Sequence, residues 1–247
     1  MLTVDGEGNV LYTRPVLPAA PDQHGDLATA VQVPPLWQVV FERIRSEILA
    51  GTFPPGTKLV ESELGERFGT SRGPIREAIR ELAREGLVAE LPRRGTVVST
   101  LTARDLAEVY AIREGLELTA SRTVIELASD SELVGLEESV VAMDKAARSK
   151  STFSEIAAHD FEFHRRFVGL AGNQRMTAIN DTMLAQTALL LRTAARANPT
   201  LRTDMERPVH RAILDALGSR DVRRAQEAVE DHYRYAEERL FAQFAAG

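Results

Sequence analysis

Four residues in the second half of this 247-residue chain have side chains that bind divalent metals: Asp160, His164, His210 and His232. Asp160 and His164 are four residues apart, so a helix projects both from one face. His210 and His232 flank a Gly-Ser-Arg-Asp break at 218–221, and a chain that folds back there places both imidazoles at similar height. One carboxylate and three imidazoles suit zinc, which we expect first, or nickel, manganese or iron(II).

Spacing alone leaves other interpretations of these four side chains open. Isolated histidines more often lie at surfaces or in satisfied hydrogen bonds, and a metal held here could be purely structural. A metal in a helical pocket could also serve an enzyme that acts on a small organic acid, with metal-bound water as the nucleophile. Against an enzyme, the chain contains no HExxH, GxSxG, Walker or complete dinucleotide-binding pattern.

A second group of residues is typical of nucleic-acid contacts. Arg72, Arg76 and Arg80 recur every four residues, so a helix carries them on one ridge beside its apolar face. Arginine bonds guanine bidentately or clamps phosphate, and Ser71 at the start of this helix leaves free N–H groups for a phosphate. The alternative is a solvated face on which these arginines pair with neighbouring glutamates.

The elements around this ridge predict a winged helix-turn-helix. An apolar helical pattern begins at Leu36. Helices over about 61–68 and 72–84 follow, separated only by Gly-Thr-Ser. Two β-prone runs around a Pro-Arg-Arg-Gly turn then predict a small hairpin with Arg94 and Gly95 at its tip.

Composition and periodicity divide the chain into three segments. Residues 1–33 are rich in proline and lack hydrophobic periodicity, so we expect a mobile N-terminal extension. Residues 34–100 hold the winged helix-turn-helix. Residues 101–247 show only helical patterns with short links, which predicts about six helices. The expected fold class is mainly α, an N-terminal winged helix-turn-helix followed by an all-α antiparallel helical bundle.

Charge is distributed unevenly over these segments. The whole chain has 36 acidic and 30 basic residues and a net charge of -6, which by itself argues against a nucleic-acid partner. Residues 36–100 have a net charge of +1, so the acidity lies outside the predicted helix-turn-helix.

The chain lacks cysteine, which excludes disulfides and thiol chemistry. It also lacks an apolar run near the roughly 20 residues that span a bilayer, and its acidic N-terminus is unlike a signal peptide. We expect a cytoplasmic protein without a membrane partner.

The stretch PPGTKLVESELGERFGTSRGPIREAIREL, followed by EGLV and RRGT, resembles the winged helix-turn-helix of the GntR family of bacterial transcription regulators. The resemblance implies that Arg72 and Arg76 contact bases or phosphates of double-stranded operator DNA. It also implies that Ser71 and Gly73 lie near the DNA backbone and Gly95 at the wing tip.

Residues 104–240 resemble the all-helical effector domain of the FadR branch of that family, the FCD type. The matching pieces include HDFEFHRRFVGLAGN and VHRAILDALGSRDVRRAQEAVEDHYR. The resemblance implies that the four metal-ligand candidates bind a metal that holds a small carboxylate effector. Arg113 and Asn173 occupy positions that could contact the effector. Their structural alternatives are a pair between Arg113 and Glu117 and a helix cap at Asn173.

Together these observations predict a ligand-responsive, DNA-binding transcription regulator. We expect a homodimer on a pseudo-palindromic operator, since two-fold symmetry lengthens the contact of one small winged domain. Effector binding would change operator affinity by linkage, and the usual behaviour of similar regulators predicts repression that the ligand relieves. The alternative is a metalloenzyme that acts on a small organic acid.

Overall fold

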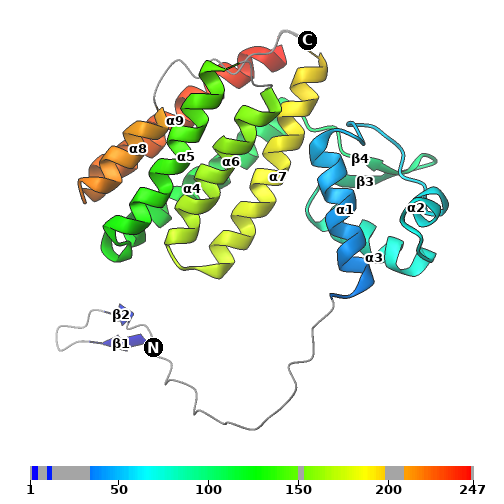
Figure 1. Cartoon of the computed structure of the whole chain (residues 1–247), viewed down its shortest axis with the longest axis horizontal. Helices are drawn as coiled ribbons and strands as arrows, with labels where there is room; N and C mark the ends of the chain where they lie inside the picture. The colour runs from blue at the N-terminus through cyan, green and yellow to red at the C-terminus, as the bar shows by residue number, and fades with distance from the viewer. Residues whose placement is uncertain (1, 5–9, 13–33, 150–152, 198–208, 246–247) are drawn as a thin grey trace. The chain divides into compact units, whose positions relative to one another are not determined.

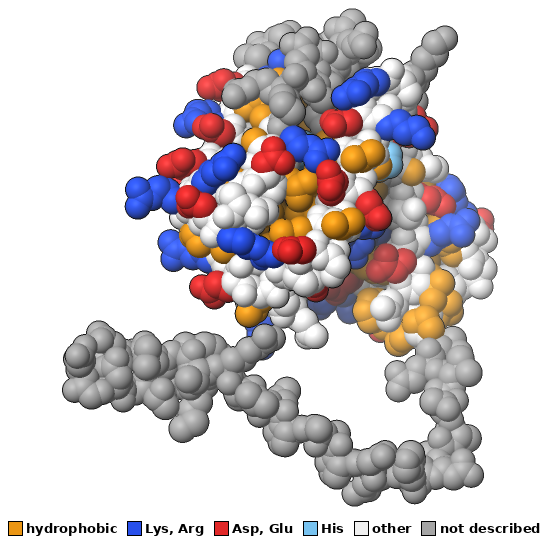
Figure 2. Space-filling model, turned by 60° about the vertical axis from the view of Figure 1, so that its left-hand side comes forward, with side chains coloured by type: hydrophobic (Ala, Val, Ile, Leu, Met, Phe, Trp, Pro, Cys, Tyr) orange, Lys and Arg blue, Asp and Glu red, His pale blue; other side chains and the backbone are white. Residues whose placement is uncertain are grey.

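The computed structural model describes residues 2–4, 10–12, 34–149, 153–197 and 209–245, with the elements labelled as in Figure 1. From residue 34 onward these elements are helices apart from one hairpin, which confirms the mainly α fold class. Acidic and basic side chains are interspersed on the face seen in Figure 2, with apolar side chains between them. In the part of the chain described, no helix has an apolar stretch that could cross a membrane.

The first layer of the fold, which we call the winged domain, spans residues 35–100. Its core is formed by the apolar faces of three helices and the hairpin, with Ile44, Ile48, Ile75 and Leu82 completely buried. The predicted helix-turn-helix and hairpin are therefore confirmed. The elements of the winged domain are α1 (Leu36–Ala50), α2 (Glu61–Phe68), α3 (Arg72–Arg84), β3 (Val88–Leu91) and β4 (Gly95–Val98).

Two glycines make the turn between α2 and α3 tight. Gly69 ends α2 with φ of 64°, a left-handed conformation that costs glycine little. A Cβ at Gly65 would lie 2.9 Å from the carbonyl oxygen of Thr70, so a larger residue there would push the turn away. The turn thereby sets the direction in which α3 leaves α2.

The second layer, which we call the bundle, has its own hydrophobic core. Six described helices form it, and they end close to the breaks predicted from the sequence. Phe163, Phe167, Leu190 and Val229 are completely buried where the helices meet. The helices are α4 (Ala103–Leu127), α5 (Asp130–Arg148), α6 (Phe153–Leu170), α7 (Gln174–Ala197), α8 (Val209–Gly218) and α9 (Val222–Ala245).

Capping boxes stabilise the N-termini of two bundle helices, α4 and α5. Thr102 accepts a hydrogen bond from the N–H of Asp105, whose carboxylate accepts one from the N–H of Thr102. These hydrogen bonds lower the pKa of Asp105 below its ordinary value. Ser129 and Glu132 form the same box at the start of α5. Thr152 and Glu155 have the same spacing in the sequence and predict another such start, but Thr152 lies outside the described residues.

The N-terminal segment forms a unit of its own, Met1–Pro34, separate from the unit Pro35–Gly247. In it the structure describes β1 (Leu2–Val4) and β2 (Val10–Tyr12), paired antiparallel. The sequence of residues 1–33 predicts no folded element, and this short hairpin shows that prediction to be wrong for its six residues. Both runs are β-prone and flank a stretch with two glycines, which explains their pairing. That the extension is mobile stays a prediction, because its other residues lie outside those described.

Candidate DNA-binding face and buried metal cluster

The face of α3 directed away from the core carries the predicted arginine ridge. Arg72, Arg76 and Arg80 are all exposed, while the opposite face of the helix packs into the winged domain. Nε of Arg76 donates to Oε2 of Glu61 on α2 at 2.8 Å, so its partner is not a neighbouring glutamate of α3. Among the described residues, Arg72 and Arg80 have no ion-pair partner. The ridge therefore presents cationic groups to solvent at the start of α3.

The remaining predicted DNA contacts are also exposed. Ser71 is the N-cap residue of α3, but its side chain makes no capping hydrogen bond within the described structure. At Gly73 a Cβ would meet no atom within 4 Å, so the surface there is open. Arg93 and Gly95 have positive φ angles of 65° and 76°, which turn the chain tightly at the wing tip and leave Arg94 exposed.

The four predicted metal ligands converge inside the bundle. One ring nitrogen from each of His164, His210 and His232 lies within 4.8 Å of the other two. Oδ1 of Asp160 lies 2.9 Å from Nε2 of His210 and 3.7 Å from Nε2 of His164. The three histidines are at most 5 % exposed. Three helices, α6, α8 and α9, supply these groups, as the fold-back at 218–221 predicted.

Burial and mutual charge set the protonation of this cluster. Burial, with the neighbouring His210 and His164, holds the pKa of His232 well below its ordinary value, so its ring is neutral and offers a lone pair. Burial raises the pKa of Asp160, but the adjacent His164 and His210 outweigh it and hold that pKa well below its ordinary value. A carboxylate and a neutral imidazole are the forms that bind metals.

The polar atoms of the cluster fit a metal. Nε2 of His164, Nε2 of His210 and Nδ1 of His232 are buried and have no hydrogen-bond partner in the described structure. Nε2 of His210 lies 2.9 Å from Oδ1 of Asp160. Buried polar atoms without partners are costly, and a shared cation would satisfy all three nitrogens at once. The three histidines could therefore hold a divalent ion, and Asp160 lies beside two of them.

Glu117 lies beside the cluster, although its sequence position predicts only a pair with Arg113. It is completely buried on α4, and its Oε1 accepts a hydrogen bond from the hydroxyl of Tyr233 at 2.6 Å. The same oxygen lies 2.8 Å from Nδ1 of His164. Burial lowers the pKa of His164, but the carboxylates of Glu117 and Asp160 outweigh it and raise that pKa. A carboxylate behind a ligand histidine orients the ring and increases its basicity.

Arg113 is buried beside this cluster rather than paired along its helix. The side chain is 2 % exposed, and only Nη1 has a hydrogen-bond acceptor in the described structure, Oγ1 of Thr187 at 3.3 Å. The guanidinium carbon lies 5.5 Å from the ring centroids of both Tyr110 and Tyr233. Because Tyr233 also stacks edge-on against His232 at 5.0 Å, one aromatic ring links the arginine to the histidines.

Asn173 lies away from the cluster. It is exposed before α7, and its Oδ1 accepts hydrogen bonds from the N–H groups of Arg175 and Met176. The structure therefore places it as a helix cap, the alternative that the sequence left open. Asn180, two turns further into α7 and not singled out from the sequence, is completely buried. Its Oδ1 has no described partner, and its Nδ2 donates to the carbonyl oxygen of His164 at 3.5 Å.

Comparison with known proteins identifies both layers. Residues 36–98 match the family model of bacterial regulatory proteins, gntR family, and residues 108–235 match the FCD domain. The chain is 31 % identical to the HTH-type transcriptional regulator YdhC of Bacillus subtilis over 210 residues, which cover 83 % of this chain and 91 % of the relative. The chain belongs to the GntR family.

Other members of the GntR family support this assignment. A probable D-xylose utilization operon transcriptional repressor of Paenarthrobacter nicotinovorans is 33 % identical over 75 % of this chain and 80 % of its own length. The crystal structure of a putative GntR regulator from Rhodococcus superposes with a TM-score of 0.71 at 22 % identity, over 83 % of this chain and 97 % of that one. McbR/YncC of Escherichia coli superposes with a TM-score of 0.72 at 20 % identity, covering 86 % and 100 %.

Membership in this family decides the class of activity. The family model and the relatives describe DNA-binding transcriptional regulators, so the chain is a transcription regulator and not an enzyme. The two solved structures show that the winged layer followed by a helical bundle is the shared fold. The metalloenzyme alternative is thereby removed.

In this GntR-family fold, α7 contacts both the buried cluster and the winged domain. Asn180 and Thr187 on one face of α7 hydrogen-bond to His164 and Arg113. On another face, Ala185 and Leu189 are buried in the core of the winged domain. The same helix therefore packs into both layers.

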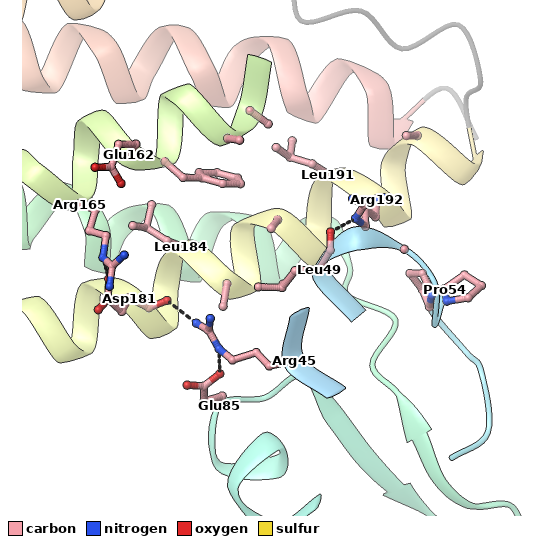
Figure 3. A pocket seen from close by; sticks show the side chains of 18 of the residues that line it. Arg45, Leu49, Pro54, Glu85, Glu162, Arg165, Asp181, Leu184, Leu191 and Arg192 are labelled. Carbon is pink, nitrogen blue, oxygen red and sulfur yellow. Dashed lines mark hydrogen bonds and ion pairs between the residues drawn. The ribbon is translucent and has the colours of Figure 1, made fainter. Parts of the chain in front are cut away.

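Polar contacts fasten the winged domain to α7 (Figure 3). Arg45 of α1 pairs with Glu85 at 2.7 Å and donates to the carbonyl oxygen of Asp181 at 3.4 Å. Nε of Arg192 donates to the carbonyl oxygen of Leu49 at 2.5 Å. A cavity of about 870 Å³ is lined by residues of these contacts and of α6, and Asp160 and the three clustered histidines are not among its lining residues.

Gln186 adds a contact at the end of α3. Its Nε2 donates to the carbonyl oxygen of Glu85 at 2.8 Å. The next residue, Gly86, has a φ of 73°, and a Cβ there would lie 2.8 Å from that same nitrogen. Glycine at this position thus lets the glutamine side chain approach the backbone that follows α3.

Proposed function

We propose that this GntR-family regulator is a metal- and carboxylate-responsive repressor. A homodimer would bind a pseudo-palindromic operator through the α3 ridge and the wing. A divalent metal, zinc first, would be held in the bundle by Asp160, His164, His210 and His232. A small carboxylate bound beside it would weaken operator binding and so relieve repression.

Exposure and direction of the ridge support the DNA contact. Arg72, Arg76 and the N-terminus of α3 project from a helix whose other face is fixed in the core, the arrangement in which a helix enters a major groove. The neutral local charge limits the affinity for random duplex, so salt-sensitive contacts at a few phosphates and bases would dominate.

The observation that carries the effector proposal is the buried guanidinium of Arg113. Its Nε and Nη2 have no hydrogen-bond partner in the described structure, although burying an unpaired charged donor is strongly unfavourable. A carboxylate is the complement of these two donors, since it accepts two parallel N–H bonds from one guanidinium. A divalent ion on the adjacent cluster would supply further positive charge that attracts the same anion.

Contacts of α7 support a route for linkage. A ligand that accepts from Nε and Nη2 of Arg113 would bind the same guanidinium whose Nη1 donates to Thr187 on α7, and α7 also contacts α1 and the residues after α3. A ligand preferring one position of α7 would shift the winged domain between DNA-competent and DNA-incompetent states. Such coupling is typically worth about 1–3 kcal/mol.

A thermal-shift screen tests the ligand part of the proposal. Purified protein is stripped with chelator, reloaded with zinc and heated in the presence of single small carboxylic acids, with a chelated sample of each as the control. We expect one chemical group of acids to raise the melting temperature only in the presence of metal. A metal-dependent shift without any response to acids would instead support a purely structural metal.

Operator binding is tested with DNA that the protein itself selects. Duplexes enriched from a random library supply the probe, and fluorescence anisotropy measures affinity with and without the active acid. We expect an enriched inverted repeat and a lower affinity when the acid is present. Unchanged affinity would contradict ligand-responsive control, and a higher affinity would contradict relief of repression.

A further inference from the structure

The cavity of about 870 Å³ beside α7 is lined by both layers of the fold. Leu49 of α1 and Pro54 of the turn that follows line it from the winged domain, and residues of α6 and α7 line it from the bundle (Figure 3). Both α1 and α6 pack against α7. Cavities of about 300–1,000 Å³ are typical of small-molecule sites. A molecule held here would contact both layers at once.

The walls of the cavity on α6 and α7 are built from small apolar side chains. The lining residues of each helix recur at helical spacing, so one face of each helix is turned toward the cavity. Larger side chains at its alanines would fill the space. The cavity borders both hydrophobic cores, because Ala157 and Leu191 belong to the core of the bundle and Ala185 belongs to that of the winged domain. The lining alanines are Ala157, Ala158, Ala185, Ala188 and Ala195.

Charged side chains border this apolar part of the cavity. Figure 3 shows Arg165 and Asp181 at one end and Arg192 at the other, with Leu184 and Leu191 between them. Asp181 precedes Arg192 by eleven residues, which is a rise of about 16.5 Å along α7. The apolar part is therefore long enough for a molecule with two linked ring systems.

The charges around the cavity largely balance one another. Nε of Arg165 lies 3.0 Å from Oδ1 of Asp181, and Nε of Arg45 lies 2.7 Å from Oε2 of Glu85. The lining contains four acidic and three basic residues, so it has no excess of positive charge that would attract an anion. A charged ligand would have to compete with these ion pairs or be partly buried without a partner, which is costly. An uncharged ligand meets neither cost.

We propose that this cavity binds an uncharged, largely apolar small molecule that holds α1 of the winged domain against α6 and α7. The affinity comes from removing the apolar faces of α6 and α7, and the apolar surface of the ligand, from water. The site is separate from the proposed metal and carboxylate site, because Arg113, Asp160 and the three clustered histidines are not among its lining residues. The inference therefore does not rest on the proposed metal or effector.

Two fluorescent probes with the same ring skeleton test the site and the charge of its ligand. Phenylnaphthylamine is uncharged, and anilinonaphthalene sulfonate adds one negative charge to the same skeleton. Fluorescence titration of the full chain measures the affinity and stoichiometry of each. We expect the uncharged probe to saturate at one site per chain, to bind more tightly than the sulfonate and to raise the melting temperature. Equal or tighter binding of the sulfonate would contradict the uncharged class.

Tryptophan substitutions on two walls test the location of the site. Ala158→Trp fills the cavity from α6, and Ala188→Trp fills it from α7. We expect each to weaken binding of the uncharged probe by about tenfold or more, because the new side chain occupies the volume that the probe needs. Ala158 is exposed and Ala188 half-buried, so the melting temperature should not fall. Ala147→Trp, the same change at an exposed position of α5, is the control and should bind the probe as wild type.

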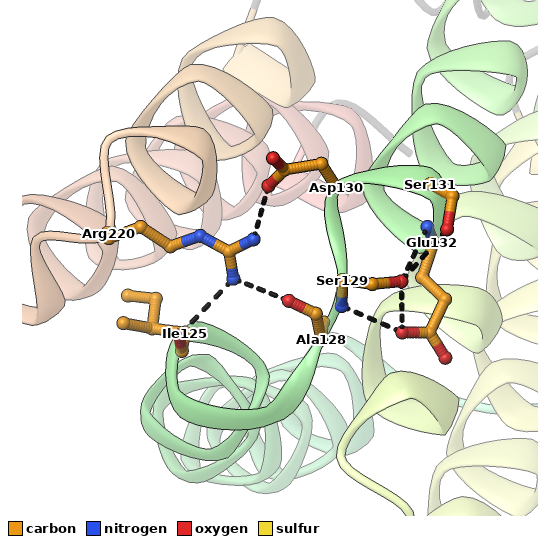
Figure 4. A network of polar contacts seen from close by, with 7 residues as sticks. All are labelled: Ile125, Ala128, Ser129, Asp130, Ser131, Glu132 and Arg220. Atoms are coloured by element: carbon orange, nitrogen blue, oxygen red, sulfur yellow. Dashed lines mark hydrogen bonds and ion pairs between the residues drawn. The ribbon is translucent and has the colours of Figure 1, made fainter.

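Arg220→Ala controls for the binding of apolar probes to loosened packing. Nη1 of Arg220 donates to the carbonyl oxygens of Ala128 at 2.7 Å and Ile125 at 3.2 Å, and Nη2 pairs with Asp130 at 2.6 Å (Figure 4). These contacts connect the α8–α9 turn to the end of α4, and none of these residues lines the cavity. We expect Arg220→Ala to unfold more easily and to bind the probe with wild-type affinity.

Three outcomes would overturn the inference. The wild-type chain could show no saturable binding of the uncharged probe, both Ala158→Trp and Ala188→Trp could bind it undiminished, or Arg220→Ala could bind it more strongly than wild type does.

His210→Ala distinguishes a failure of this site from a failure of the proposed metal and effector site. This variant should bind the uncharged probe as wild type, and loss of the probe would place it in the histidine cluster and contradict the inference. Conversely, Ala158→Trp should keep any metal-dependent response to carboxylic acids. Each proposal can therefore fail without the other.

Discussion

The winged domain and the bundle hold their functional side chains in opposite ways. In the winged domain, Arg72, Arg76 and Arg94 are exposed and lie outside the core. In the bundle, Arg113 and His164 are buried, and several of their polar atoms have no described partner. The first region presents charge to a large anion outside the protein. The second encloses charge that only a small ligand could reach.

Because of this difference, substitutions in the winged domain and in the bundle should affect stability differently. Replacing an exposed arginine usually changes the free energy of unfolding by no more than about 0.5 kcal/mol. A buried polar group without a partner costs about 1–3 kcal/mol, so the bundle should be strained without its ligands and stabilised by them. Variants in the winged domain should therefore affect binding alone, whereas variants in the cluster should affect both.

The largest effect is expected for Arg72→Ala combined with Arg76→Ala. Each arginine that contacts a base is worth about 1–3 kcal/mol, so the pair should cost about 2–6 kcal/mol of binding to the selected duplex, measured by anisotropy. Thermal unfolding should stay within about 1 kcal/mol of wild type. Arg84→Ala, at the far end of the same helix, is the control. Undiminished specific binding by the double variant would contradict the predicted face.

Removal of a metal ligand should show the contrasting behaviour of the bundle. Zinc at a hundred times its dissociation constant stabilises a folded protein by about 2.7 kcal/mol, and His210→Ala or His232→Ala should abolish most of that gain. Metal analysis of the purified variants and melting with and without zinc measure it. His159→Ala, next to Asp160 but outside the cluster, should behave as wild type. Equal metal content in all variants would refute the ligand set.

A scaffold residue of the bundle should affect stability without affecting DNA. Arg220→Ala removes hydrogen bonds to two carbonyl oxygens and an ion pair, and we expect unfolding to become easier by about 1–3 kcal/mol. Chemical denaturation measures this change, with exposed Arg223→Ala as the matched control. Lost affinity for the selected duplex in a folded Arg220→Ala protein would show that the two layers are less independent than this comparison implies.

The smallest effect is expected at the contact between the layers. Gln186→Ala removes the hydrogen bond to the backbone of Glu85 and should reduce the effect of the active acid on duplex affinity by about 0.5–2 kcal/mol. Zinc binding should be unchanged, since Gln186 is not part of the cluster. Ile179→Ala, exposed on the same helix, is the control. Full retention of the acid's effect would show that α7 does not couple the layers through this contact.

Patterns of the sequence predicted the elements and the four convergent ligands because both depend on local spacing. Residues four apart share a helix face, which relates Asp160 to His164. The break at 218–221 makes two neighbouring helices antiparallel, which relates His210 to His232. The spacing therefore predicts that the four side chains lie close together. Glu117 was interpreted only through its neighbour Arg113. Arg113 and Glu117 are polar residues on the face of α4 that is otherwise apolar, and that pattern could have indicated a buried role for both.

Asn173 and Asn180 illustrate the limit of that approach. Both follow helical patterns near the cluster in sequence, but only the packing of α7 against α6 buries Asn180 and leaves Asn173 as a surface cap. The N-terminal hairpin was missed for a related reason. Its two strands are three residues each, too short for periodicity to distinguish from a loop.

By itself, the sequence determined a helix-turn-helix with a basic wing, a six-helix domain and a set of metal-binding side chains, since these follow from spacing along one chain. Only the tertiary structure decided which polar groups are buried without partners, which helix joins the two layers and which residues line the cavity beside that helix. Burial and contact depend on side chains far apart in the sequence, such as Arg113 with Thr187 and Glu85 with Gln186. No local pattern contains that information.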